Sequence, residues 1–157
     1  IRGWRLLSDE LTMISLEDCS VLPLPRPVSL KNESIEIIKA FCPSSIMGRV
    51  AHDTLKGTVA HMRAPADAVQ RSNESARPAW IVFPKYVAGS ALKFSPYSKG
   101  EGAIRLINNS FNYSILSELG FVTLTRLVDQ CECFSFEYSS LEDAVTHFYH
   151  LADKKAG

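Results

Sequence analysis

The segment AWIVFPKY, residues 79–86, decides the fold because it contains the most continuous apolar run of the chain. An unbroken run such as AWIVF, residues 79–83, is typical of a strand that is covered on both faces. We therefore predict a buried strand here, near the middle of a sheet. The run is far shorter than the roughly 20 residues that span a bilayer, so it predicts no membrane helix.

The apolar period changes repeatedly along the rest of the chain, which indicates mixed α and β structure. Residues 57–62 and 134–138 have the pattern of strands, whereas the second half of the chain is mainly helical in pattern. The length of 157 residues, with 46% hydrophobic content, allows one sizeable core. We predict a single domain over residues 1–157 of the α/β class, with a mixed sheet and covering helices.

Local signals predict where several helices begin and end. Asn32 is expected to cap a helix that ends before Pro43. Ser98 is followed three residues later by Glu101, which is a capping-box spacing. Gly120 is expected to terminate a helix that starts near residue 113.

Composition excludes several classes of function. Basic and acidic residues both number 17, so the net charge is zero and neither nucleic acid nor an anionic membrane is an expected partner. The four histidines form no H-E-x-x-H motif, which disfavours a metal-dependent hydrolase. The four cysteines fit neither a disulfide framework nor a paired zinc site, so we expect a cytoplasmic protein with reduced thiols. They are Cys19, Cys42, Cys131 and Cys133.

An adjacent pair of acids, Asp9 and Glu10, ends the apolar stretch RGWRLLSDEL of residues 2–11. Such a pair can hold magnesium or accept a proton. Consecutive side chains of a regular strand point to opposite faces, so both acids enter one site only if the strand ends or bulges between them. Otherwise they are ordinary charges at a strand end.

Several cations of the first half are compatible with phosphate binding. Lys31 and Asn32 stand at the predicted helix N-terminus, where free N–H groups favour an anion. Arg26 lies in the proline-rich segment, and Lys56 precedes Gly57. Each alone is typical of a solvated surface charge. Together with the acid pair they predict a phosphate site.

Four blocks of the sequence together resemble the HPr kinase-related kinase A family, a relative of the HPr kinase/phosphorylase group of bacterial serine kinases. The blocks are RGWRLLSDE, LPLPRPVSLKNESIEII, DTLKGTVAH and WIVFPKYVAG. The resemblance covers nearly the whole chain. It implies part of an HPr kinase/PEP carboxykinase-like P-loop kinase core and an ATP-dependent transfer to a hydroxyl of an unknown protein or small-molecule acceptor. It also implies a homo-oligomer.

The resemblance suggests roles for the acid pair. Asp9 matches the first aspartate of the group's motif, which accepts the proton, and Glu10 matches the second, which serves magnesium through a longer side chain here. We expect Arg26 and Lys56 to act with Asp9 in catalysis, as cations that stabilise the transferred phosphoryl group. The nucleotide contacts are expected from Lys31 and Asn32.

A phosphate-cradling G-x-x-x-x-G-K-[ST] loop is absent from the 157 residues. We expect this loop upstream of Ile1, which would make the chain the C-terminal portion of a longer kinase-like protein. ATP and Mg²⁺ are then the cofactors of the intact protein, and neither is expected to bind this chain tightly. The alternative is a non-catalytic protein-binding or assembly module with a kinase-like core.

Overall fold

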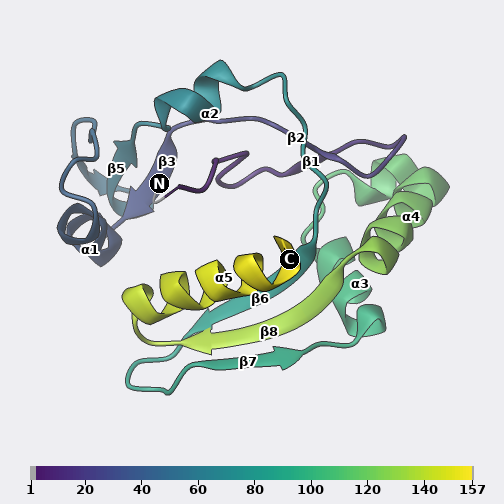
Figure 1. Ribbon diagram of the computed structural model, residues 1–157. Helices are drawn as coiled ribbons and strands as arrows, with labels where there is room; N and C mark the ends of the chain where they lie inside the picture. Colours follow the sequence, from purple (N-terminus) through teal and green to yellow (C-terminus); the bar gives the residue numbers. More distant parts are fainter. Residues whose placement is uncertain (1–2, 157) are drawn as a thin grey trace. The chain divides into compact units, whose positions relative to one another are not determined.

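The computed structural model describes residues 3–156, and within them five helices and three small sheets form a mixed α/β fold (Figure 1). The predicted α/β class is confirmed. The chain divides into two compact units, residues 1–77 and 78–157, and the assignment of one domain stays a prediction. No helix of the described part is long and apolar enough to cross a membrane. Arg2 of the RG pair lies outside the described residues.

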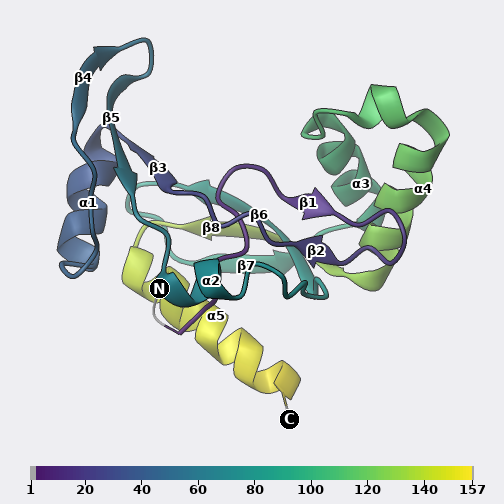
Figure 2. The same ribbon diagram turned by 90° about the horizontal axis from the view of Figure 1, so that it is seen from above.

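The N-terminal unit is built on a three-stranded antiparallel sheet in the order β3-β5-β4 (Figure 2). The predicted strand over 57–62 is confirmed as β5. Helix α1 packs on β3, and together these elements bury a small core of Leu30, Ile35, Ala60 and Met62. The elements are β3 (Val28–Lys31), α1 (Glu33–Phe41), β4 (Ala51–Thr54) and β5 (Gly57–Met62).

The start of the chain contains little regular structure. A two-stranded antiparallel ladder joins β1 (Met13–Ile14) to β2 (Val21–Leu22), and a short helix, α2 (Ala66–Gln70), follows β5. The proline-rich segment after β2 runs to β3 without helix, as expected because proline rings exclude an interior helical position. Asp9 and Glu10 lie in a bend rather than in a strand.

The C-terminal unit contains a mixed sheet in the order β6-β8-β7, in which β6 is parallel and β7 antiparallel to β8. Helices cover both faces of β8. Gly102 of α3 approaches the Cys133 Sγ on one face, and Phe148 of α5 contacts Phe136 on the other. The elements are β6 (Trp80–Tyr86), β7 (Lys93–Pro96), α3 (Lys99–Asn108), α4 (Tyr113–Gln130), β8 (Glu132–Tyr138) and α5 (Leu141–Ala156).

The predicted central position of residues 79–83 is wrong. Strand β6 forms an edge of its sheet, and β8 lies in the middle. The physical reason is visible within β6 itself, because Pro84 has no N–H to donate and proline is confined to edge strands and bulges. The apolar run still has a covered partner, since β6 pairs in parallel with β8 along its whole length.

Of the helix signals in the C-terminal unit, Ser98 gave a correct boundary and Gly120 gave an error. Ser98 caps α3 as predicted, with its Oγ accepting a hydrogen bond from the Glu101 N–H at 3.2 Å. Gly120 does not end a helix. It is buried inside α4, where a Cβ would stand 3.1 Å from the Cβ of Leu116. The break in this helix comes earlier, at Ser117, whose φ of 50° is outside the helical region.

An aromatic cluster between β7, β8 and α5 surrounds His147. The imidazole lies 4.5 Å from the Phe94 ring and 5.8 Å from the Phe148 ring, measured between centroids. Its Nε2 is buried and makes no hydrogen bond within residues 3–156. This burial is the main cause that lowers the pKa of His147 below 6.5, and the nearby charges of His150 and Lys154 act in the same direction.

This environment predicts that acid weakens the C-terminal unit. The unfolded chain takes up a proton near pH 6.5 while the folded unit resists it, so stability is complete above that pH and falls as the pH drops below it. His147→Phe should remove this loss, so the variant should lose less stability than the unaltered chain between pH 8 and pH 5. Urea unfolding at both pH values measures it. The same substitution at exposed His52 of the N-terminal unit is the control, and an equal effect at both positions would contradict the prediction.

Candidate functional site

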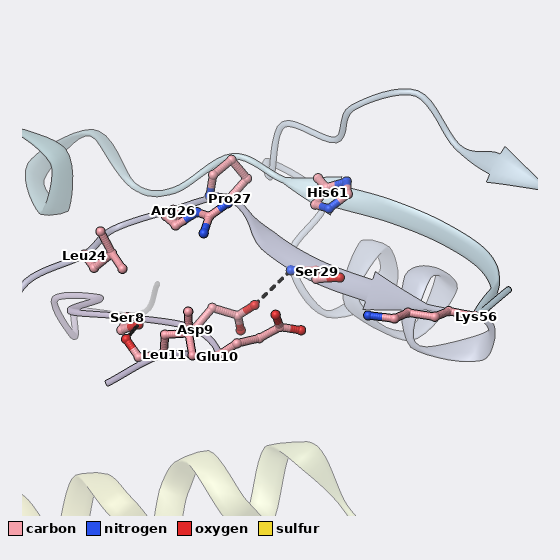
Figure 3. Close-up of a pocket in the computed structure, with 10 residues that line it drawn as sticks. All are labelled: Ser8, Asp9, Glu10, Leu11, Leu24, Arg26, Pro27, Ser29, Lys56 and His61. Atoms are coloured by element: carbon pink, nitrogen blue, oxygen red, sulfur yellow. Dashed lines mark hydrogen bonds between the residues drawn. The ribbon is translucent and has the colours of Figure 1, made fainter. Parts of the chain in front are cut away.

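The two acids of the bend line one cavity of about 440 Å³ in the N-terminal unit (Figure 3). In a regular strand the side chains of Asp9 and Glu10 would point to opposite faces. Because the two residues lie in a bend, this restriction does not apply to them. Both acids therefore reach the same space. The cavity is lined by Ser8, Asp9, Glu10, Leu11, Leu24, Arg26, Pro27, Ser29, Lys56 and His61.

Asp9 is held by the backbone of β3. Its Oδ2 accepts a hydrogen bond of 3.0 Å from the Ser29 N–H, drawn as a dashed line in Figure 3. The Asn32 N–H, three residues on, donates toward β5, to the Thr58 carbonyl. Because N–H groups alternate in direction along a strand, the Ser29 N–H points out of the sheet. Asp9 thus accepts a hydrogen bond from a backbone N–H group that has no partner strand at the sheet edge. Its second carboxylate oxygen stays available to a ligand.

Glu10 is paired with Lys31 in a looser contact. The Lys31 Nζ lies 3.7 Å from the Glu10 Oε1, and the two side chains are 41% and 61% exposed. Ion pairs with this exposure contribute at most about 1 kcal/mol. A ligand with a stronger charge can therefore displace Lys31, which does not itself line the cavity.

Two cations reach the cavity from separate segments. Arg26 follows a tight turn in which its N–H donates to the Leu24 carbonyl at 2.8 Å, and Lys56 comes from the turn between β4 and β5. Neither side chain forms a salt bridge with another residue of the described part. Their positive charge faces the acids without touching them, so it remains available to an anion.

Asn32 occupies the N-cap position of α1 as predicted, but its side chain makes no capping hydrogen bond. Its Oδ1 instead accepts from the Thr58 N–H at 3.1 Å, which ties the start of α1 to β5. Ser34, in the first turn of α1, accepts from the Lys31 N–H at the end of β3 at 2.8 Å. Asn32 does not line the cavity. The nucleotide contacts expected of Lys31 and Asn32 stay a prediction.

Two further residues line the cavity: Ser29, which was not identified from the sequence, and His61, which the sequence placed on the strand after Lys56 and Gly57. They are direct partners across the β3–β5 ladder, so their side chains lie on the same face of the sheet. The signal that would have placed them side by side is the register of this ladder. The sequence pattern of these short strands does not specify that register.

The acid pair also limits the kind of metal that fits. Within residues 3–156 no three or more His, Cys, Asp or Glu side chains are grouped to hold an ion. A dedicated protein cage is thus not formed by this part of the chain. Two carboxylates in one cavity do fit magnesium, which takes one or two protein carboxylates and completes its shell with water and phosphate oxygens.

Comparison of the chain with protein-family models, with curated proteins and with solved structures finds no match. An assignment of function therefore depends on the cavity and on the sequence blocks that contribute to it. Three of those blocks supply cavity residues, namely the acids, the Arg26 segment and the Lys56–His61 segment.

The contacts of Asn32 predict a structural contribution. Its φ of 51° is unfavourable for a residue with a β carbon, and its side chain satisfies the Thr58 N–H. Asn32→Ala should lose that bond and keep the strain, lowering the free energy of unfolding by about 1–3 kcal/mol. Asn32→Gly should cost less because glycine accepts this φ.

Urea unfolding of the 157-residue chain measures the two variants, with Asn73→Ala in an exposed turn as the control. Equal losses for Asn32→Ala and Asn32→Gly would show that backbone strain does not contribute. A loss no greater than that of the control would contradict the structural contribution altogether.

Proposed function

We propose that this chain is the C-terminal part of an HPr kinase-like, ATP-dependent phosphotransferase that acts on a hydroxyl group. The observation that carries the proposal is the cavity in which Asp9 and Glu10 face Arg26 and Lys56 without forming salt bridges to them. Phosphoryl transfer needs a base, a magnesium ligand and positive charge beside the phosphoryl group. The cavity offers residues for all three. The resemblance of the sequence to the HPr kinase-related kinase A family supports the same reaction.

Asp9 is the proton acceptor of the proposed reaction. The Ser29 N–H holds one carboxylate oxygen, so the other is positioned to take the proton of the attacking hydroxyl. The hydroxyl oxygen forms a bond to the γ-phosphorus of ATP while the bond between that phosphorus and the leaving ADP oxygen breaks. General bases of this kind contribute about 10²–10⁴-fold to the rate.

Glu10 is the proposed magnesium ligand. Its exposed pairing with Lys31 is weak enough for a divalent ion to replace. Magnesium, when bound, neutralises charge on the nucleotide phosphates. Arg26 and Lys56 add the positive charge that stabilises the phosphoryl group during transfer. The loop that cradles the ATP phosphates belongs to sequence outside these residues in this proposal.

A non-catalytic assembly module is the second candidate, and exposed apolar residues of the C-terminal unit favour it. Ile104 of α3 is 61% exposed, and Phe111 and Ile115 near the start of α4 are 86% and 82% exposed. Large apolar side chains with this exposure are available for a contact with another protein. A module of this kind would not depend on Asp9, which separates the two candidates.

The proposal predicts different defects for the two acids in the natural protein that carries this sequence. Asp9→Asn keeps the size of the side chain but removes its basicity, so phosphotransfer should fall about a hundredfold or more while nucleotide affinity is retained. Glu10→Gln should instead raise the magnesium concentration needed for half-maximal turnover, because additional metal compensates in part for a weakened site.

Rate curves against magnesium, with nucleotide affinity measured in parallel, test both variants. Asp67→Asn, an exposed acid of the same unit outside the cavity, is the matched control. Turnover of Asp9→Asn at the level of this control would sink the assignment of the base. No transfer in the unaltered protein to any hydroxyl acceptor would favour the assembly module.

A further inference from the structure

The two free cations of the cavity lie on different sides of the acid pair. In Figure 3 the Arg26 guanidinium lies on the side of Asp9, and the Lys56 ammonium lies on the side of Glu10. One phosphoryl group beside a magnesium ion at Glu10 would be next to Lys56. It would leave Arg26 beside the proposed base, where the acceptor hydroxyl must enter.

Within the described part of the chain, Arg26 keeps an unpaired positive charge, whereas both acids of the cavity have formed contacts. This charge favours the binding of a second anion at Arg26. Asp9 is already engaged by the Ser29 N–H, and Glu10 is paired with Lys31. Arg26 has no such partner in the described part of the chain. A guanidinium binds phosphate and carboxylate through two parallel hydrogen bonds. A neutral acceptor would leave this capacity unused.

Hydrogen-bonding side chains continue along the same wall. Ser29 and His61 face the cavity from adjacent strands as direct cross-strand partners, and in Figure 3 both lie between Arg26 and Lys56. The hydroxyl and the imidazole can bind polar groups of an acceptor that extends from Arg26 toward the base. Leu24 and Pro27 add a short apolar wall near Arg26.

The backbone holds Arg26 in place before any ligand arrives. Arg26 lies between Pro25 and Pro27, and the residue before a proline is restricted to extended conformations. Its N–H is bound to the Leu24 carbonyl. Because the backbone at Arg26 is restricted, ligand binding there orders less of the chain than binding on a free loop.

The size of the cavity indicates how large the acceptor is. A volume of about 440 Å³ lies within the range of about 300–1,000 Å³ that is usual for small-molecule sites. The space accommodates a compound of a few heavy atoms together with the transferred phosphoryl group. A protein acceptor would place only one side chain there.

We infer that the acceptor is a small hydroxyl compound that carries its own phosphate or carboxylate group, which Arg26 binds beside Asp9 while Lys56 faces the transferred phosphoryl group. This inference rests on the proposed phosphotransfer and names its class of acceptor. The hydroxyl loses its proton to Asp9 and gains the phosphoryl group, so the product carries two anionic groups.

A crossed binding experiment on the 157-residue chain tests the assignment without nucleotide. Glycerol 3-phosphate is the probe for an anionic acceptor, glycerol is its neutral counterpart, and pyrophosphate represents the phosphates of the donor. Calorimetry should show that glycerol 3-phosphate binds at least tenfold more tightly than glycerol. It should also bind more tightly than inorganic phosphate, because the hydroxyl part contributes near Asp9.

Two variants should separate the cations. Arg26→Gln should weaken glycerol 3-phosphate about tenfold or more and pyrophosphate about threefold or less, and Lys56→Gln should show the reverse order. Arg49→Gln, an exposed arginine of the same unit outside the cavity, should change neither affinity. Circular dichroism verifies that each variant is folded.

Several results would overturn the inference. These are equal affinity for glycerol and glycerol 3-phosphate, equal affinity for glycerol 3-phosphate and inorganic phosphate, or equal losses of both probes in Arg26→Gln and Lys56→Gln. Transfer that depends on Asp9 but goes to a neutral acceptor would overturn this inference alone. If Arg26 binds glycerol 3-phosphate selectively but the protein transfers no phosphoryl group, the proposed function is overturned. The site at Arg26 would then be an anion-binding site without this reaction.

Discussion

The cavity depends on one hydrogen bond, from the Ser29 N–H to the Asp9 Oδ2. It joins a bend near the start of the chain to the outer edge of β3, across twenty residues of sequence. Without it the Ser29 N–H would lack this partner, and the acid segment would be joined to the chain before β3 through the bond from the Leu24 N–H to the Leu7 carbonyl. Because Glu10 follows Asp9 directly, the same bond brings Glu10 within reach of Lys31, two residues farther along β3. The two contacts together align the acid segment with the strand.

Each unit has an edge strand whose outward backbone groups must be kept from pairing with another strand, and the two units do this in different ways. In the N-terminal unit the outward N–H groups of β3 at Ser29 and Lys31 are bound by side chains, those of Asp9 and Ser34. In the C-terminal unit β6 contains Pro84, which removes one donor from its strand. Both devices make strand addition at the edge less favourable. Only the first also brings a carboxylate into the cavity, since Asp9 covers the edge with one oxygen.

The features that the sequence predicted correctly are those that local chemistry determines. β5 over residues 57–62 and the Ser98 cap can each be identified within a few residues. The errors concern relations between distant segments. The apolar run of β6 indicated burial but not its place in the strand order, and Gly120 indicated a helix end where its missing β carbon serves close packing inside α4. His61 became a site residue only through its register with Ser29.

Opposite charges share the cavity without forming salt bridges to one another. Arg26 lies between two prolines, Lys56 projects from a two-residue turn, and neither is paired with an acid within residues 3–156. Lys31, on the regular strand, is the cation that reaches Glu10, and the exposure of that pair keeps it weak. Arg26 and Asp9 both line the cavity and form no salt bridge within residues 3–156. A ligand with a hydroxyl and an anionic group bridges these two residues and gains contacts that the chain cannot make by itself.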